Sequence, residues 1–283
     1  MVLLSDPIRL LPTLATMSID VPWAAVIGAR LRSQSATGSW HVDDVNAPSA
    51  LAHALLPSES GALRVQLASW GVASAALALA VAAVSTHALP GGNVSVAALD
   101  RALVDPLSAT LSREHGLEQS WRERCGLYVR RRGAALCGSS KPLPDGARIR
   151  ELRAEDAPAV NAEWTYKSET SLQMVQAVIE EDRIGCCLGC ELADGSLVGW
   201  VLRYGDGALG MLHVDESMRR LGVARALVSH AARALDAKDE ASFAYIVDTN
   251  AASRGLFESL GWDRAADCDW VGFCPRGAGT GTT

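Results

Sequence analysis

The sequence has no excess of positive charge. Its 283 residues include 26 Lys and Arg against 32 Asp and Glu, which gives a formal net charge of −6 at pH 7. Nucleic acids and anionic membranes attract proteins mainly through clustered basic side chains. We therefore expect no nucleic acid and no anionic membrane as the main partner, although a local basic patch for one small anionic ligand remains compatible with this balance.

We also expect no secretory leader at the first residues. Met1-Val-Leu-Leu-Ser-Asp-Pro7 has an acid and a proline where a signal peptide needs a basic region and an apolar run. Asp6 and Asp20 count against an Arg-rich mitochondrial transit helix. The cysteines number seven, an odd count. We expect reduced thiols in an intracellular protein, cytoplasmic by preference, with the mitochondrion as the alternative.

A membrane span is not expected either. The stretch from Leu67 to Val84 is largely apolar, but Ala dominates it, Trp70 and Gly71 interrupt it, and no basic flank follows. Because Ala contributes little transfer free energy, this composition favours a packed helix, or a helix with an adjoining strand.

Metal-ligand spacing is absent around the cysteine cluster Cys186-Cys187-x-x-Cys190. No second Cys or His pair stands at zinc-ligand spacing. The cluster falls on a predicted strand, where neighbouring side chains face opposite sides of a sheet. We expect buried thiols and no metal.

The sequence does contain enough apolar residues for a normal core, with 49% hydrophobic and 20% charged residues. Linker and turn residues gather in Ser139-Ser-Lys-Pro-Leu-Pro-Asp-Gly146. We place a domain boundary there. Residues 1–142 are expected to form a smaller N-terminal α/β half-domain with a strand at 126–130, and residues 143–283 the domain that carries the chemistry.

Apolar periodicity and turn residues organise this second domain. The helix predicted over 168–181, for example, places Leu172, Val175 and Ile179 on one face. The order of elements predicts an α/β domain with a mixed sheet. Strands are predicted at 147–152, 184–191, 197–204, 209–214 and 243–247, and helices at 156–164, 168–181, 222–236 and 250–260.

The most informative motif is Arg219-x-x-Gly222-x-Ala224, which joins a predicted strand to a predicted helix. The N-terminus of a helix presents unpaired N–H groups and a positive dipole end. Such an end binds pyrophosphate well. Gly222 lets the backbone approach the phosphates without a Cβ in the way, and Arg219 and Arg220 add positive charge at the rim.

This spacing is similar to the R/Q-x-x-G-x-G/A signature of the GNAT acyltransferases. Asn250-Ala-Ala-Ser253-x-x-x-Phe257-x-x-Leu260-Gly261-Trp262 resembles the GNAT segment after the fifth strand, and residues 148–157 resemble the opening strand and turn. The resemblance implies a GNAT (acyl-CoA N-acyltransferase) fold with a mixed, mostly antiparallel sheet. It implies acyl-CoA as co-substrate and no metal.

The chain is more specifically similar to the glycine N-acyltransferase-like group, which has an FR47-like C-terminal domain. Leu143-Pro-Asp-Gly146, Asp156-Ala157 and Val160-Asn161-x-x-Trp164 resemble that group's domain entry, as Cys186–Gly189 and Ser229–Ala231 resemble later segments. The resemblance implies an N-acyltransferase that transfers an acyl group from acyl-CoA to the amine of an amino acid such as glycine, or to another small amine.

The same resemblance implies which residues hold acyl-CoA. Main-chain groups of Leu212 and Val214 would bind the pantetheine arm, which Asn250 and Ser253 would contact from the other side. The basic rim would be Arg219 and Arg220, and the pyrophosphate would lie on the amides of Leu221, Gly222, Val223 and Ala224.

Two departures concern proton transfer. The carboxylate thought to act as base in glycine N-acyltransferases corresponds to Ala208, and the general-acid tyrosine of many GNATs corresponds to Phe257. Candidates for a replacement base are His213, Asp206, Glu163 and Tyr204; His213 has the right intrinsic pKa range, and Asp206 sits in a predicted turn. A water chain could carry the proton instead, or the activity could be weak or lost.

Two alternative functions therefore stay open. The chain could be a GNAT that acetylates a protein or peptide amine. It could instead be a catalytically weak or inactive CoA-binding GNAT protein that acts as a sensor or scaffold. The sequence leaves the acyl chain, the acceptor and the oligomeric state open.

Overall fold

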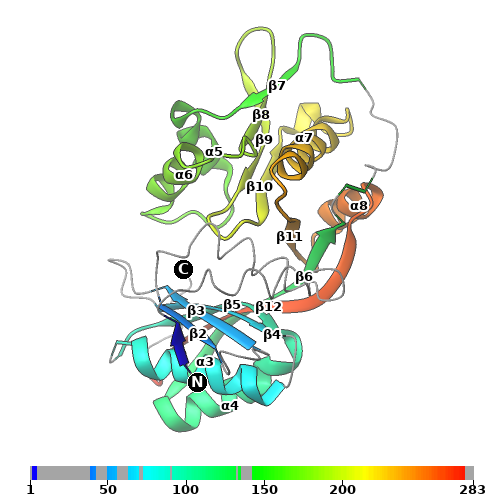
Figure 1. The fold of residues 1–283 in the computed structure, drawn as a ribbon. Helices are drawn as coiled ribbons and strands as arrows, with labels where there is room; N and C mark the ends of the chain where they lie inside the picture. The colour runs from blue at the N-terminus through cyan, green and yellow to red at the C-terminus, as the bar shows by residue number, and fades with distance from the viewer. Residues whose placement is uncertain are drawn as a thin grey trace. The chain divides into compact units, whose positions relative to one another are not determined.

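The structure, a computed structural model, describes residues 2–4, 39–42, 50–55, 63–69, 73–89, 91–131, 133–134 and 142–277 (Figure 1). Contacts divide the chain into two compact units. Unit 1 comprises Met1–Leu127, Ile246–Thr249 and Arg264–Thr282, and unit 2 comprises Tyr128–Tyr245 and Asn250–Asp263. The domain boundary at 142/143 stays a prediction. Within the described ranges, no helix is both long and apolar enough to cross a membrane.

Unit 1 is built on a mixed sheet with two helices on one face. The strand order is β1-β2-β3-β4-β5-β12-β6-β11 in an eight-stranded sheet, in which β4 and β5 are parallel. The strands of this sheet are β1 (Val2–Leu4), β2 (Ser39–Val42), β3 (Ala50–Leu55), β4 (Leu63–Ser69), β5 (Val94–Asp100), β6 (Leu117–Arg130), β11 (Ser242–Val247) and β12 (Asp263–Pro275).

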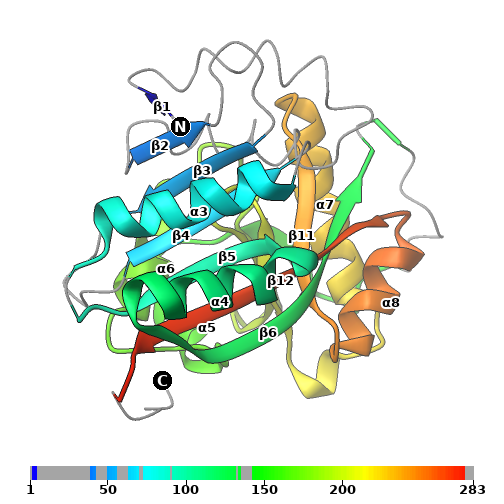
Figure 2. The same ribbon diagram turned by 90° about the horizontal axis from the view of Figure 1, so that it is seen from below.

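Helices α3 (Ala73–His87) and α4 (Val104–His115) cover the same face of this sheet (Figure 2). Apolar side chains recur three or four residues apart on both helices and pack on the strands. Leu79 and Leu107 from the helices and Val65 and Val96 from the strands are fully or almost fully buried in one cluster. The short helix η2 (Arg101–Leu103) leads into α4.

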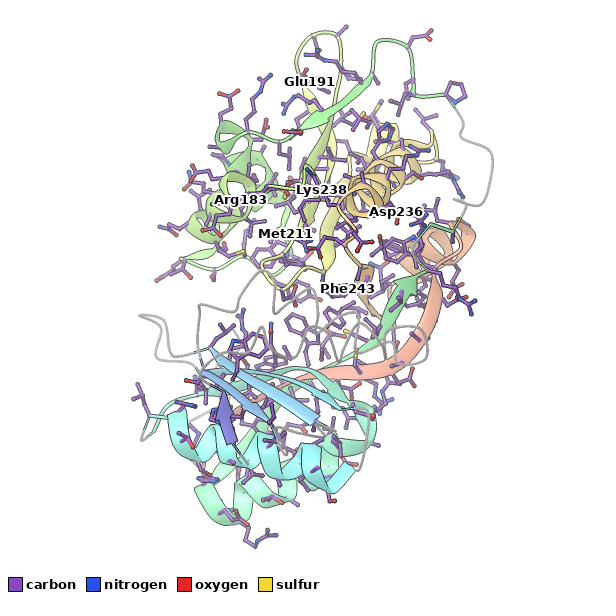
Figure 3. The ribbon with its side chains drawn as sticks, in the orientation of Figure 1. Arg183, Glu191, Met211, Asp236, Lys238 and Phe243 are labelled. Carbon is purple, nitrogen blue, oxygen red and sulfur yellow. The ribbon has the colours of Figure 1, made fainter. Side chains whose placement is uncertain are left out.

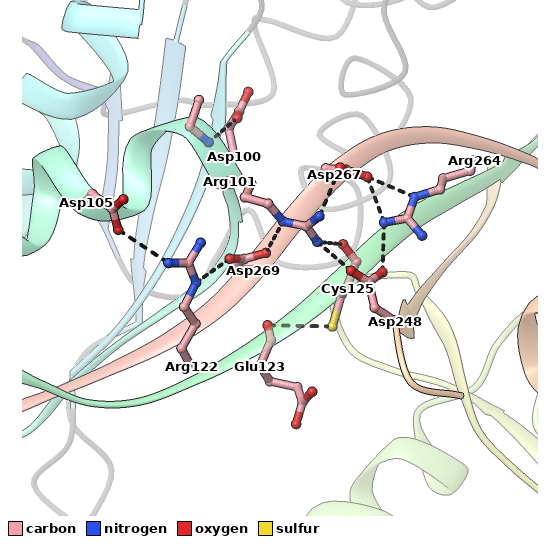
Figure 4. Close-up of polar contacts among 11 residues, drawn as sticks. Asp100, Arg101, Asp105, Arg122, Glu123, Cys125, Asp248, Arg264, Asp267 and Asp269 are labelled. Carbon is pink, nitrogen blue, oxygen red and sulfur yellow. Dashed lines mark hydrogen bonds and ion pairs between the residues drawn. The ribbon is translucent and has the colours of Figure 1, made fainter. Parts of the chain in front are cut away.

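A network of arginines and aspartates crosses unit 1 (Figure 4). The Asp269 carboxylate of β12 has no exposed surface. It accepts hydrogen bonds from Nε of Arg101 at 2.8 Å and from Nε of Arg122 at 2.6 Å. Arg101 also donates to Asp248 at 2.8 Å. The remaining members are Asp105, Asp267 and Arg264.

Unit 2 contains a four-stranded sheet in the order β10-β9-β8-β7. Each strand pairs with its neighbour in the antiparallel sense. Its strands are β7 (Arg148–Glu151), β8 (Leu188–Glu191), β9 (Leu197–Arg203) and β10 (Leu209–Val214), and its helices are η3 (Ala154–Asp156), α5 (Ala157–Glu163), α6 (Ser171–Glu180), η4 (Glu216–Met218), α7 (Val223–Ala237) and α8 (Ala251–Ser259).

Helices α5 and α6 cover one face of this sheet and α7 the other. Trp200 of β9 packs in one cluster with Val160 of α5 and Val175 of α6. The neighbouring residue Gly199 faces the opposite side, because a Cβ built on it would lie 3.3 Å from Cγ1 of Val223 in α7. Successive side chains of β9 therefore point to opposite faces of the sheet and pack against the helices on each face.

The predicted mixed, mostly antiparallel sheet with helices is confirmed, and the strand predicted at 209–214 has the observed bounds. Of the run from Leu67 to Val84, residues 67–69 end β4 and residues 73–84 lie in α3, as the strand-plus-helix alternative predicts, and residues 70–72 lie outside the described residues. The strand predicted at 126–130 is the last part of the longer β6.

The strand predicted from Ile184 is wrong at its start, since β8 begins at Leu188. The Asp182 carboxylate accepts hydrogen bonds from the N–H groups of residues 184–187. Gly185 has a φ of +77° in the same turn. These amides therefore bind one side chain instead of a neighbouring strand.

Candidate functional site

Strand β10 lies at the edge of the four-stranded sheet, next to β9. The next strand along the chain, β11, belongs to the other sheet, so these consecutive strands are not paired with each other among the described residues. An edge strand offers a row of backbone N–H and C=O groups for another extended chain. β10 can therefore bind an extended ligand through its main chain.

The middle of β10 is irregular. The pairing with β9 shifts between Gly210 and His213, and Met211, labelled in Figure 3, has a φ of +47°. Such a bulge bends a strand and redirects its backbone groups. Leu212, one of the two residues predicted to bind the pantetheine arm, lies within it.

The turn after β10 leads into the N-terminus of α7. Nε of Arg219 donates to the carbonyl of Val214 at 3.1 Å, which fixes this arginine against the end of β10. Gly222 is the N-cap residue of α7 with a φ of +91°, and as a glycine it has no side chain with which to cap the helix. The amides of the first turn are therefore available to a ligand. Arg220 and Leu221 are exposed beside them.

Asn250 begins α8. Its Oδ1 accepts a hydrogen bond from the N–H of Ser253 at 3.0 Å, the usual arrangement of an N-cap asparagine. The Asn250 side-chain NH₂ group is not used by this cap. One terminal nitrogen of Arg225 in α7 donates to Oγ of Ser259 in α8 at 2.6 Å, which joins the two helices.

The predicted CoA-binding residues therefore form two groups. Leu212, Val214 and residues 219–224 are one continuous strand–turn–helix segment, and Asn250 and Ser253 start the helix that Arg225 joins to it. Their roles toward acyl-CoA stay predictions.

His213 is held by two neighbours. Its ring stacks on the indole of Trp200, with ring centroids 4.5 Å apart and planes 16° from parallel. Its Nε2 lies 3.2 Å from Oδ1 of Asp215. Because Trp200 packs with α5 and α6, the His213 side chain faces that side of the sheet, whereas Cγ2 of Val214 lies near Gly199 on the α7 side.

The other candidate bases differ in their surroundings. Oδ1 of Asp206 accepts from the N–H of Ala208 at 3.0 Å, which is a turn-forming contact. Desolvation and the nearby Asp206 carboxylate raise the pKa of Tyr204, which disfavours the phenolate that a base would require. Glu163 is exposed at the end of α5. Among the four candidates, these contacts favour His213 as the base.

Ala208 and Phe257, which correspond to the family's base and general acid, both lie in the core. Ala208 is buried, and Phe257 is buried with its ring edge-on to Trp262, the centroids 4.8 Å apart. Neither side chain carries an exchangeable proton.

The cysteine cluster is buried, as predicted. The thiol of Cys186 donates to the carbonyl of Ala231 in α7, and the thiol of Cys187 to that of Val178 in α6. The two sulfurs thus face opposite layers. Burial raises the pKa of Cys186 to about 12. Within the described ranges, no group of three or more His, Cys, Asp or Glu side chains is placed to hold a metal ion.

Sequence reasoning missed Asp215 and Trp200. Alternation in a strand places residues two apart on one face, so the spacing of His213 and Asp215 was an available signal. The contact with Trp200 depends on the register of β9 against β10, which pairs residue 200 with residue 213. No pattern in the sequence gives that register.

Comparison with known proteins gives one match to a family model. Residues 183–271 match the family model described as FR47-like protein, a segment that runs from before β8 into β12. No curated protein matches the chain significantly.

Several solved structures are similar to the chain. A Drosophila protein solved by X-ray is 20% identical with a TM-score of 0.78, and the match covers 97% of this chain and 98% of that one. A GCN5-related N-acetyltransferase from Kribbella flavida is 17% identical, with a TM-score of 0.57 over 90% and 96% of the two chains. A tandem GNAT protein from the clavulanic acid biosynthesis pathway is 16% identical, with a TM-score of 0.55 over 98% and 96%.

The fold is therefore that of the GNAT proteins, in a tandem GNAT-like arrangement. The FR47-like match covers residues 183–271, under half of the chain, and the solved structures show the fold.

Proposed function

We propose that the chain is an acyl-CoA-dependent N-acyltransferase that transfers an acyl group to the amine of an amino acid such as glycine, or of another small amine. The GNAT fold and the FR47-like match support acyl transfer from CoA in general. The amino-acid acceptor is supported by the sequence resemblance at the domain entry.

One observation carries the proposal: an edge strand with a bulge runs directly into an uncapped helix N-terminus. The pantetheine arm of CoA is an extended amide chain, which backbone groups of Leu212 and Val214 in β10 would bind. Its pyrophosphate is dianionic and would lie on the amides of residues 221–224, with Arg220 at the rim.

Asn250 and Ser253 complete the proposed acyl-CoA site from α8. The Asn250 NH₂ group is left over from the helix cap and would donate to a carbonyl of the arm. No part of this site needs a metal, because backbone N–H groups at the bulge would stabilise the oxyanion of the tetrahedral intermediate.

Proton transfer is the step for which the chain departs from the family pattern. His213 and Asp206 are the proposed proton carriers, and the contacts of His213 favour it over Asp206. The buried Ala208 and Phe257 favour the second candidate function, a CoA-binding protein without turnover.

Thiol release distinguishes these functions. Acetyl-, benzoyl- and medium-chain acyl-CoA are mixed with the protein and with glycine, glutamine or other amines, and free CoA is measured. Release that depends on the acceptor supports the N-acyltransferase. Acyl-CoA binding by calorimetry without release under any of these conditions contradicts it and supports the sensor or scaffold. Release only with peptide amines would favour a peptide acetyltransferase.

A further inference from the structure

We propose a proton relay in which Nδ1 of His213 takes the proton of the attacking amine and passes it to solvent, while Asp215 and Trp200 position the ring. This inference rests on the proposed N-acyl transfer. It identifies the group that replaces the carboxylate missing at Ala208.

The hydrogen bond to Asp215 selects the basic nitrogen. An ionised carboxylate only accepts hydrogen bonds, so Nε2 of His213 carries the proton that it donates to Oδ1 of Asp215 across 3.2 Å. The lone pair of the neutral ring is then on Nδ1. A base held by a carboxylate in this way keeps one tautomer and one orientation, which general-base catalysis requires.

Trp200 supports one face of the same ring. Its indole is buried, and it stacks almost parallel to the imidazole of His213 at 4.5 Å. The face of an indole attracts a cation. The Trp200 face and the Asp215 carboxylate therefore both lie against the ring that takes the proton from the amine. The His213 side chain is 22% exposed, so the ring is not sealed in the core.

The position of His213 in the strand fits this task. It lies between Leu212 and Val214, the two residues proposed to bind the pantetheine arm, and its side chain faces the α5–α6 side of the sheet. The helix α7, whose N-terminus would hold the pyrophosphate, covers the other side. The amine would therefore approach the thioester from the α5–α6 side, which the His213 side chain faces.

The proton balance of the step is complete. The amine nitrogen attacks the thioester carbonyl carbon, the C–S bond breaks, and the sulfur leaves with the electron pair of that bond. The amine proton passes to Nδ1 of His213 and from there to solvent, and the thiolate takes a proton from solvent. The products are the amide and free CoA.

Kinetics of matched variants test the relay. At saturating acyl-CoA, His213→Ala is expected to lower kcat by about 10²-fold or more, while calorimetry shows unchanged acyl-CoA affinity. Added imidazole restores part of the lost rate. Asp215→Asn lowers kcat by about tenfold or more, because an amide also accommodates the other tautomer, and Asp215→Glu regains part of it. Glu216→Gln, a neighbouring carboxylate on η4, leaves kcat unchanged.

Nitrogen NMR of histidine-labelled protein reads the tautomer without turnover. We expect a protonated Nε2 for His213 in the wild-type protein and a mixture of tautomers in Asp215→Asn. A protonated Nδ1 in the wild type would overturn the relay, as would a wild-type kcat in His213→Ala, or equal losses in Asp215→Asn and Glu216→Gln. Absence of acceptor-dependent CoA release from the wild type would instead overturn the proposed function itself.

Discussion

Gly222 is the single residue on which the proposed phosphate site depends most directly. Its φ of +91° is a conformation that side-chain-bearing residues rarely adopt, and it precedes the free amides of α7. We predict that Gly222→Asp abolishes acyl-CoA binding, because the carboxylate brings bulk and a negative charge to the place of the pyrophosphate. Isothermal titration with acetyl-CoA measures the loss.

Gly195 provides the matched control for this change. It also has a positive φ, +86°, and a Cβ there would meet nothing within 4 Å. Gly195→Asp therefore carries the same backbone strain and the same charge in a turn outside the site. If both variants bind acetyl-CoA like the wild type, the phosphate site is assigned to the wrong turn.

At the level of single residues, the sequence predicts part of the site. The motif at Arg219 and Gly222 identifies the turn, and Asn250 caps a helix as its residue type favours. The partners of His213 are harder to predict. Asp215 follows from alternation, but Trp200 reaches the ring only through the register of two strands.

Elements of unit 2 are joined by a buried ion pair between β7 and η3. The Arg150 guanidinium donates both to Oδ2 of Asp156, at 2.7 Å, and to Oδ1, at 2.9 Å. Burial alone would raise the pKa of Asp156, but the hydrogen bonds from Arg150 and from the N–H of Arg153 outweigh it and lower the pKa. The folded state therefore favours the ionised carboxylate.

This pair makes stability sensitive to acid. The stabilisation is fully present above the ordinary aspartate pKa of about 4 and is lost as the pH falls through the lower pKa of the folded protein. We predict that Asp156→Asn costs about 3 kcal/mol of unfolding free energy at pH 7 and reduces the loss of stability below pH 4. Urea unfolding followed by circular dichroism measures both. An unchanged midpoint would contradict the prediction.

A histidine pair joins β2 to the end of α3 in unit 1. Nε2 of His41 lies 3.0 Å from Nε2 of His87. Burial, and for His41 also the charge of His87, lowers the pKa of both rings. Since the folded protein binds these protons less readily than the unfolded chain, the free energy of unfolding falls as the pH drops below about 6.5.

We predict that His87→Asn reduces this dependence. The variant retains a side chain that can hydrogen-bond His41 but no longer titrates. Unfolding measured at pH 7.5 and pH 5 should show a smaller difference in free energy than in the wild type. An equal difference in both proteins would contradict the role of the pair.

Prediction at the scale of elements succeeds where local signals agree. The bounds of β10 follow from its apolar run between two turns, and α7 from its apolar face. The sequence gives no local signal for β12, whose residues include Asp267 and Asp269. These charges are compensated by arginines that include Arg101 and Arg122, far away in the chain, so tertiary contacts decide that this segment is a strand.

Unit 1 as a whole depends on that charge network. The buried Asp269 links Arg101, before α4, with Arg122 of β6. We predict that Asp269→Asn lowers the unfolding free energy of this unit by about 3–5 kcal/mol, because two arginines each lose one charged partner, the only one of theirs among the described residues that is fully buried. Asp105, whose side chain is 90% exposed, is the control, and Asp105→Asn should cause no measurable loss. Equal stability of both variants in urea unfolding would contradict this account of the network.

For the whole molecule, the sequence motif predicts the GNAT fold that the structural comparisons show. The tandem GNAT-like arrangement was harder to predict, since residues 1–142 carry no chemical motif. The eight-stranded sheet depends on pairings between segments far apart in the sequence, such as β12 with β5. Pairings of that kind follow from packing rather than from local sequence.

The proposed activity is tested most directly by mass spectrometry of the acceptor. Wild-type protein and Gly222→Asp are incubated with acyl-CoA and a panel of amino acids and small amines, and the amines are examined for the added acyl group. We predict an N-acylated product with the wild type and none with the variant. If the wild type binds acyl-CoA yet forms no N-acyl product with any amine, the proposed N-acyltransferase activity is contradicted.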